Sequence, residues 1–154
     1  NITGLTVDPA SGDVYVTGPF NSPYLYLNAA GATSYSPTVI ATNSNTGLPI
    51  TSDVFVAKFN SSGAMQWIKS GGSSSTVTND NMYKGIAYMS GGLYAGAVTA
   101  TNSTFNWGAS SIATVSSGSM VSTTDMVLMK LDPATGSALW LKTWGGNSSD
   151  IITS

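Results

Sequence analysis

The sequence contains an internal repeat, and a repeated chain folds as a series of similar units that pack on one another. Residues 53–72 read DVFVAKFNSSGAMQWIKSGG, and residues 125–146 read DMVLMKLDPATGSALWLKTWGG. Aspartate, lysine, tryptophan, a second lysine and a glycine pair recur in the same order, with one residue added in the turn and one before the glycines. Each copy has an apolar run, a polar turn and a second apolar run, which predicts a β-hairpin.

A second pair of matching segments precedes the hairpins. Residues 4–18 read GLTVDPASGDVYVTG, and residues 85–97 read GIAYMSGGLYAGA, with two residues fewer in the turn. Each unit is therefore predicted to contain four strands. The expected strands are residues 5–7, 13–17, 53–59 and 64–69 in the first unit, and 86–88, 93–98, 126–131 and 138–143 in the second.

The repeat divides the chain into two predicted units and a remainder. Residues 1–72 form the first four-stranded unit, with an insertion at 19–52, and residues 73–146 form the second, with an insertion at 99–124. Residues 147–154 are interpreted as the lead-in to a further repeat. The predicted fold class is all-β, with tandem four-stranded antiparallel units that stack like blades on one another, because stacking buries both faces of each sheet.

The two ends of the sequence can be interpreted as continuous with each other. Gly85 follows Gly71 by 14 residues, and Gly4 of a second copy placed after Ser154 would follow Gly145 by 13. This spacing predicts either one period of a tandem array or a chain that joins head to tail with a copy of itself. A contact of that kind that does not close into a ring generates an open filament.

These motifs resemble the bacterial β-propeller repeats often called SBBP, which occur in secreted and surface proteins. The resemblance lies in the GLTVDPASGDVYVTG segment, the DVFVAKF strand and the tryptophan of the next strand, and it spans both units. It implies a scaffold at the cell surface and no shared enzymatic activity. The alternative fold is a β-sandwich of the pilin type, which a strand donated by a neighbour completes.

Charged residues are rare, which argues against several classes of function. The chain has five lysines, seven aspartates, a formal net charge of −2, and no arginine, glutamate, histidine or cysteine. Nucleic-acid binding relies on clustered lysine and arginine, and acid–base or nucleophilic catalysis usually relies on histidine, glutamate or cysteine. We therefore expect a protein that is not an enzyme, needs no cofactor or metal and binds no nucleic acid.

The remaining composition indicates where such a protein works. No apolar run approaches the ~20 residues of a membrane-spanning helix. The 43 serine and threonine residues, together with many glycines and asparagines, give a polar but uncharged surface. This composition is typical of an extracellular or cell-surface β-protein.

Aromatic residues in the two insertions are candidates for an interaction surface. Tyr24 and Tyr26 lie in the first insertion, and Phe105 and Trp107 occupy the corresponding part of the second. Exposed rings of this kind bind glycans or other proteins. The YLYL run that contains the two tyrosines also fits an extra strand that packs within its own loop.

Tryptophan and lysine occur at equivalent positions in the two units. Trp67 and Trp140 are predicted to pack between units, because a residue repeated once per unit is usually a packing residue. Lys58 and Lys130 are interpreted as partners of aspartates in structural ion pairs, or as solvated lysines that keep a sheet edge from pairing wrongly.

Four Asn-X-Ser/Thr sequences mark candidate glycosylation sites. They begin at Asn1, Asn60, Asn102 and Asn147. With 11 asparagines and 43 serines and threonines, about three such sequences are expected by chance, so their positions are more informative than their number. Asn60 is predicted in a hairpin turn and Asn102 in an insertion, both at the surface.

Two hypotheses for function follow from the sequence. The first is a structural extracellular repeat unit that self-associates head to tail, as a component of a filament or surface layer. The alternative is a propeller module that binds a glycan or a protein through its insertions. The partners are therefore copies of the chain itself or glycans.

Overall fold

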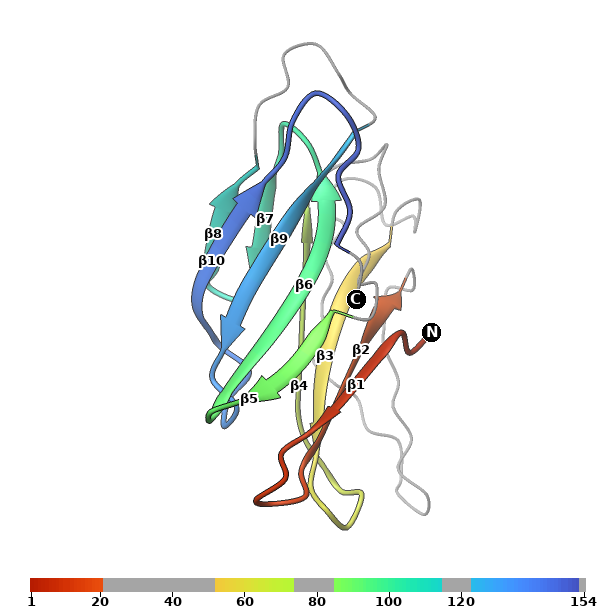
Figure 1. The fold of residues 1–154 in the computed structure, drawn as a ribbon, viewed down its shortest axis with the longest axis vertical. Helices are drawn as coiled ribbons and strands as arrows, with labels where there is room; N and C mark the ends of the chain where they lie inside the picture. Colours follow the sequence, from red (N-terminus) through yellow and green to blue (C-terminus); the bar gives the residue numbers. More distant parts are fainter. Residues whose placement is uncertain (21–51, 74–84, 115–122, 153–154) are drawn as a thin grey trace.

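The computed structural model describes residues 1–20, 52–73, 85–114 and 123–152. Within these ranges the regular secondary structure consists of β-strands alone, and the strands form two open antiparallel sheets (Figure 1). The all-β class and the antiparallel pairing predicted from the repeat are therefore confirmed for this part of the chain.

The first sheet contains the strands predicted for the first unit and a hairpin from the second. Its meander consists, in order, of β1 (Gly4–Val7), β2 (Val14–Phe20), β3 (Asp53–Phe59) and β4 (Met65–Ser73). Beyond β4, the sheet continues with β7 (Thr104–Trp107) and then β8 (Ser110–Ala113). The second insertion thus adds two strands to the sheet of the first unit, which the repeat did not predict.

The second sheet is a meander with the same strand order as the first unit. It consists of β5 (Ile86–Met89), β6 (Gly92–Ala100), β9 (Thr124–Leu131) and β10 (Ala138–Trp144), each paired with the next. All eight strands expected from the repeat are present, with ends that differ by a few residues. The largest difference is at β4, which runs four residues past the expected end.

Two Asp-Pro turns, one between β1 and β2 and one between β9 and β10, are built in the same way. The Asp8 carboxylate accepts hydrogen bonds from the Ala10 amide at 2.9 Å and the Ser11 hydroxyl at 3.0 Å. The Asp132 carboxylate accepts the equivalent bonds from Ala134 and Thr135. Each turn ends in a glycine with positive φ, a conformation that L side chains rarely adopt. Both aspartates therefore act as turn residues.

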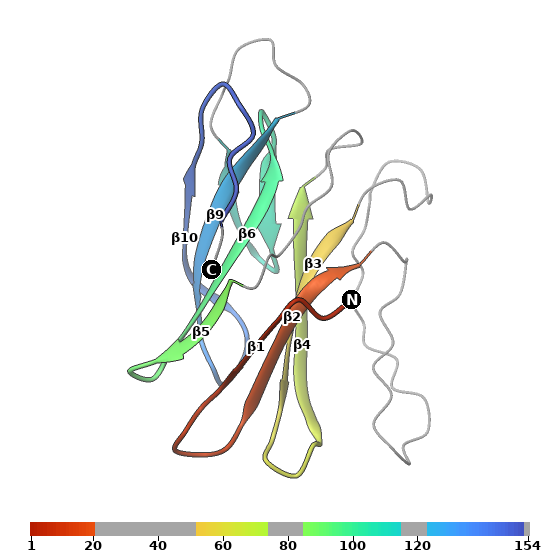
Figure 2. The same ribbon diagram turned by 45° about the vertical axis from the view of Figure 1, so that its right-hand side comes forward.

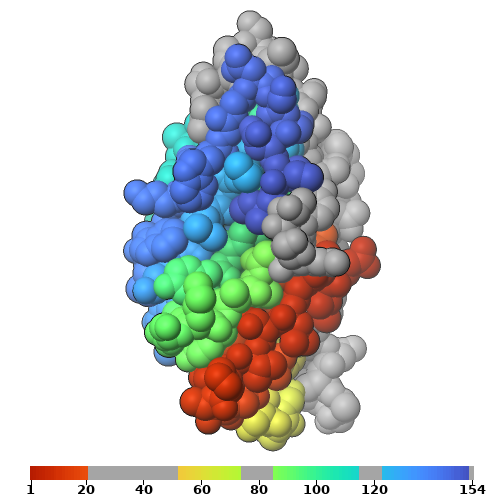
Figure 3. All heavy atoms as spheres, in the orientation of Figure 1, coloured from red at the N-terminus to blue at the C-terminus, as the bar shows by residue number. Residues whose placement is uncertain are grey.

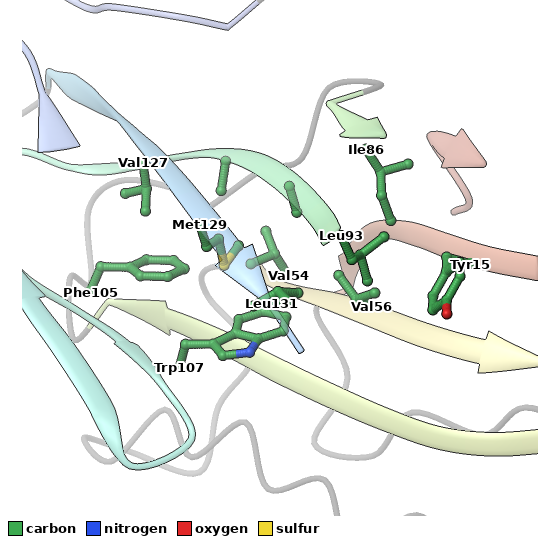
Figure 4. Packing of buried hydrophobic residues seen from close by; sticks show 12 residues of the cluster. Tyr15, Val54, Val56, Ile86, Leu93, Phe105, Trp107, Val127, Met129 and Leu131 are labelled. Atoms are coloured by element: carbon green, nitrogen blue, oxygen red, sulfur yellow. The ribbon is translucent and has the colours of Figure 1, made fainter. Parts of the chain in front are cut away.

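The two sheets pack face to face over one apolar core. Alternate side chains of a strand point to opposite faces, and one face of each sheet contributes to this core (Figure 4). The buried residues are Tyr15, Val54 and Val56 from the first meander, Phe105 and Trp107 from β7, and Ile86, Leu93, Ala95, Ala97, Val127, Met129 and Leu131 from the second sheet.

The two sheets contact each other through faces that are not equivalent in the repeat. Figure 2 shows them as separate layers, with β5, β6, β9 and β10 on one side and β1 to β4 on the other. The repeat aligns Tyr15 with Tyr94 and Val14 with Leu93. Tyr15 of the first sheet and Leu93 of the second point into the shared core, whereas Tyr94 points away from it. The Tyr15 face of one unit therefore packs against the Leu93 face of the next.

The β7–β8 hairpin contacts both units. β7 pairs with β4, where Trp107 lies opposite Gly71. A Cβ on Gly71 would overlap the backbone oxygen of Asn106 and come within 2.6 Å of Trp107 Cε3, so only glycine lets β7 approach this closely. From the other side, the Thr143 hydroxyl of β10 donates to the Ala113 carbonyl of β8 at 3.2 Å. The hairpin is therefore held between β4 and β10.

Candidate interaction surface

Each four-stranded meander carries one row of three aligned side chains across its three longest strands. In each row a lysine lies opposite a tyrosine on one neighbouring strand and opposite a tryptophan on the other. The first row is Tyr15, Lys58 and Trp67, and the second row is Tyr94, Lys130 and Trp140. The repeat thus preserves the register of three strands, which is stronger support for equivalence than matching letters alone.

The first row is covered by the second sheet. Lys58 Nζ lies 5.6 Å from the centre of the Tyr15 ring, a cation–π contact. The Tyr15 ring stacks on Tyr88 of β5, with centroids 5.7 Å apart and an interplanar angle of 10°. The Trp67 indole N–H donates to the Pro133 carbonyl at 3.2 Å. The predicted packing role of Trp67 between units is confirmed.

The second row has the same internal geometry, but no strand of the described residues lies over it. Lys130 Nζ lies 5.5 Å from the Tyr94 ring centre, and the Tyr94 and Trp140 rings are 6.3 Å apart. Trp140 is 37% exposed, and Trp144 is also exposed on the same face of β10. Among the described residues Trp140 is therefore not packed between units, in contrast to the prediction, because no described strand lies over this face of the second sheet.

The two lysines differ in their charge partners. Lys58 Nζ lies 2.8 Å from the Asp13 carboxylate, so the predicted structural ion pair is confirmed at this position. In the second unit Gly92 occupies the position of Asp13, and a Cβ there would come within 3.1 Å of Lys130 Cε. Among the described residues, no carboxylate lies within ion-pair distance of Lys130. Lys130 is thus a half-buried cation on an outward face.

The Asp13–Lys58 pair shifts the pKa of both groups. The hydrogen bond from Lys58 is the main cause of the lowered pKa of the Asp13 carboxyl. Burial alone would lower the pKa of Lys58, but Asp13 and the nearby Tyr15 outweigh it, so the pKa is raised above its usual value. Both shifts favour the charged forms in the folded state.

Replacing Asp13 with asparagine is expected to reduce the dependence of stability on pH. Because the folded-state pKa of Asp13 lies below its unfolded value of about 3.8, its contribution is present above pH 4 and is lost as the pH falls through the folded pKa. Urea unfolding of wild type and D13N between pH 2.5 and 6 would measure the effect, and the K130M variant, which touches no ion pair, is the control. Parallel pH profiles for wild type and D13N would contradict this assignment.

A second exposed apolar surface lies at the opposite side of the molecule. Leu5 is 61% exposed and Val7 43% exposed, both on the face of β1 that points away from the second sheet. Their equivalents in the second unit are Ile86, which is buried, and Tyr88, which packs against the shared core. The described residues therefore expose, on opposite sides, the positions that are covered where the two units meet.

The aromatic residues predicted to form an interaction surface do not do so together. Tyr24 and Tyr26 lie outside the described residues. Phe105 and Trp107 are completely buried in the core, and the Trp107 indole N–H donates to the Gly136 carbonyl at 2.9 Å. The interaction-surface interpretation is therefore wrong for Phe105 and Trp107, because β7 pairs with β4 and turns both rings toward the second sheet.

The four candidate glycosylation residues differ in their surroundings. Asn1, Asn102 and Asn147 are exposed, whereas Asn60 is half-buried at the end of the β3–β4 turn. The Asn60 side-chain oxygen accepts hydrogen bonds from the amides of Ser62 at 3.1 Å and Ala64 at 2.8 Å. Asn60 therefore has a structural role in the turn, and glycosylation at all four sites stays a prediction.

The sequence pattern missed Leu5, Val7 and Tyr94 as surface residues. They lie in strands, and an isolated strand does not reveal which face a partner covers. The signal that could have found them is the repeat itself, since it pairs each with a residue whose burial shows which face meets a neighbouring sheet.

Comparison with known proteins adds no family to this description. No protein-family model matches the sequence, and no curated protein is significantly similar to it. The resemblance to SBBP repeats stays a prediction from the motifs. Within the described ranges, no helix is long and apolar enough to cross a membrane.

Proposed function

We propose that this chain is a structural repeat unit that associates head to tail with copies of itself in an extracellular or cell-surface assembly. The observation that carries the proposal is the direction of the internal packing, in which the Tyr15 face of one sheet covers the Leu93 face of the next. The outer face of the second sheet, with Tyr94, is equivalent to the first of these faces. This outer face therefore carries, at equivalent positions, the residues that the next sheet covers in the first unit.

A directional contact of this kind has a consequence for assembly. The two contacting surfaces differ from each other, so the contact is heterologous, and each added unit exposes a new copy of the surface that was just covered. Such a contact closes into a ring or extends into a filament. A propeller of blades and an open surface-layer filament are the two outcomes of the same packing, and we propose the open form for this chain.

The chemistry of the chain supports an extracellular and structural role. Hydroxyl and amide side chains dominate its polar residues, and charged side chains are rare. Asp8 and Asp132 stabilise turns, and Asp13 forms an ion pair. A scaffold function without catalysis agrees with this use of the charged groups.

Replacing Trp140 with serine is expected to weaken self-association. In the internal interface the equivalent Trp67 packs against the core, so removal of the Trp140 ring would take apolar area from the contact, worth about 25 cal/mol per Å². Sedimentation velocity over a wide concentration range would give the dissociation constant for wild type and W140S. We expect the variant to need a several-fold higher concentration for the same degree of assembly.

The variant L139S is the matched control for this experiment. Leu139 is 60% exposed and lies beside Trp140 in β10, but its equivalent Gln66 stays exposed in the internal interface. L139S should therefore associate like wild type. A monodisperse monomer for wild type at all concentrations would overturn the proposal, and binding of a soluble oligosaccharide through Trp140 by that monomer would favour a glycan-binding module instead.

A further inference from the structure

We infer that the outer face of the second sheet, at Tyr94 and Trp140, binds the β1 side of the first sheet of a second copy, at Leu5 and Val7. This inference rests on the proposed function and names the two surfaces through which neighbouring copies meet. In Figure 3 the second sheet, in blue and green, and the N-terminal end of the first sheet, in red, are both visible from the same side.

The internal interface provides the pattern for this contact. There, Tyr15 stacks on Tyr88, and the buried Ile86 lies beside it in β5. Transferred to the next contact by the repeat, Tyr94 takes the place of Tyr15, and Val7 and Leu5 of the second copy take the places of Tyr88 and Ile86. These three residues are apolar or aromatic, and the two of β1 are exposed at present.

A polar pair in the internal interface is replaced by apolar residues at the equivalent positions of the proposed contact. Across the internal interface the Tyr88 hydroxyl bonds to the Asp8 carboxylate, which is the main cause of the raised pKa of Tyr88. The equivalents of these residues are Val7 and Met89, which lack both the hydroxyl and the carboxylate. The polar pair is replaced on both sides at once, so the new contact leaves neither group buried without a partner. Met89 is 58% exposed and is available for it.

The parts of the two surfaces that are still open correspond to each other. On the first sheet, Val16, Phe55 and Ala57 are already buried, which leaves the β1 edge exposed. On the second sheet, Ile152 covers Gly96, since a Cβ there would lie 2.9 Å from Ile152 Cδ1. The open part is the end at Tyr94, Lys130 and Trp140. The repeat sets this end against β1 of the next unit.

The proposed contact is expected to be weaker than the internal one. Inside the chain, the Tyr88 amide donates to the Thr6 hydroxyl at 3.1 Å. Ala87 stands at the position of Thr6 in the second unit and offers no acceptor. A weak contact of this kind forms more readily where the local concentration of copies is high, as in a filament.

Site-specific cross-linking tests this contact, because the chain has no native cysteine. A Val7→Cys copy and a Tyr94→Cys copy are mixed and treated with a short bis-maleimide. We expect a cross-linked heterodimer with several-fold higher yield than either variant forms alone, since the contact joins unlike surfaces. The control is Leu139→Cys mixed with Val7→Cys, in which the Leu139 position is more exposed than Tyr94 but lies outside the predicted contact. Unchanged thermal unfolding of each variant shows that it is folded.

The outcomes separate this inference from the proposed function. If copies associate in sedimentation but Val7→Cys links as well to itself or to Leu139→Cys as to Tyr94→Cys, the inference is wrong and self-association stands. If copies do not associate at any concentration and no pair links above background, both fail. A preferential Val7–Tyr94 link supports both.

Discussion

The Trp107→Ala variant is expected to lose about 3–5 kcal/mol of unfolding free energy, the usual cost of removing a large aromatic ring from a core. Trp107 is fully buried between the sheets and packs over Gly71. Its removal opens a cavity at the junction of β4, β7 and the second sheet. It also leaves the buried carbonyl of Gly136 without the indole N–H that now donates to it at 2.9 Å. Urea denaturation at pH 7 measures the loss.

Two further variants separate packing from hydrogen bonding in this effect. W107F keeps most of the ring and removes the N–H, so we expect a smaller loss of about 1–3 kcal/mol, the cost of an unsatisfied buried acceptor. W144A removes an exposed tryptophan and should change stability by less than about 0.5 kcal/mol, as is usual at the surface. A loss in W107A no larger than in W144A would contradict the burial of β7.

The Gly71→Ala variant is expected to detach the β7–β8 hairpin from β4. A methyl group at this position overlaps the backbone oxygen of Asn106, and backbone cannot move aside as a flexible side chain does. Insertion of extra volume into a packed site costs about 1–3 kcal/mol, and here the cheapest relief is separation of the two strands. Hydrogen exchange, read residue by residue, should show lost protection of the amides in β7 and β8.

The same experiment distinguishes local detachment from general destabilisation. In G71A, protection of β2 and β3 should remain close to wild type, because they lie on the far side of β4. N106A is the matched control, since it changes an exposed side chain of β7 and leaves the backbone oxygen in place. If exchange in G71A rises equally in all strands, the hairpin is not an independently opening element.

The repeat and the strand pattern were sufficient to predict the eight strands of the two meanders, but not β7 and β8. An aspartate turn such as the one at Asp8 restricts the chain locally, and alternating apolar residues restrict each strand, so neither needs a distant partner. In the structure, Lys58 and Lys130 lie in equivalent strand registers. Turn chemistry and side-chain alternation are short-range properties that depend on consecutive residues.

The candidate interaction surface was less accessible to sequence reasoning. Phe105 and Trp107 follow an insertion pattern that fits either a loop or a strand, and only the pairing of β7 with β4 turns them inward. Trp67 and Trp140 are the same residue in the same register, yet one is covered and the other exposed. Whether a side chain is buried depends on the segment that packs against it. The repeat alone does not say which sheet faces are covered by another sheet.

The sequence by itself thus determined that the chain is a repeat of antiparallel β-meanders, because turn chemistry and side-chain alternation act over a few residues. Only the tertiary structure decided that the units face one way, that a hairpin of the second extends the sheet of the first, and that Lys58 pairs with Asp13. Each of these depends on contacts between segments far apart in the chain, where the choice among sheet faces and edges is made by packing.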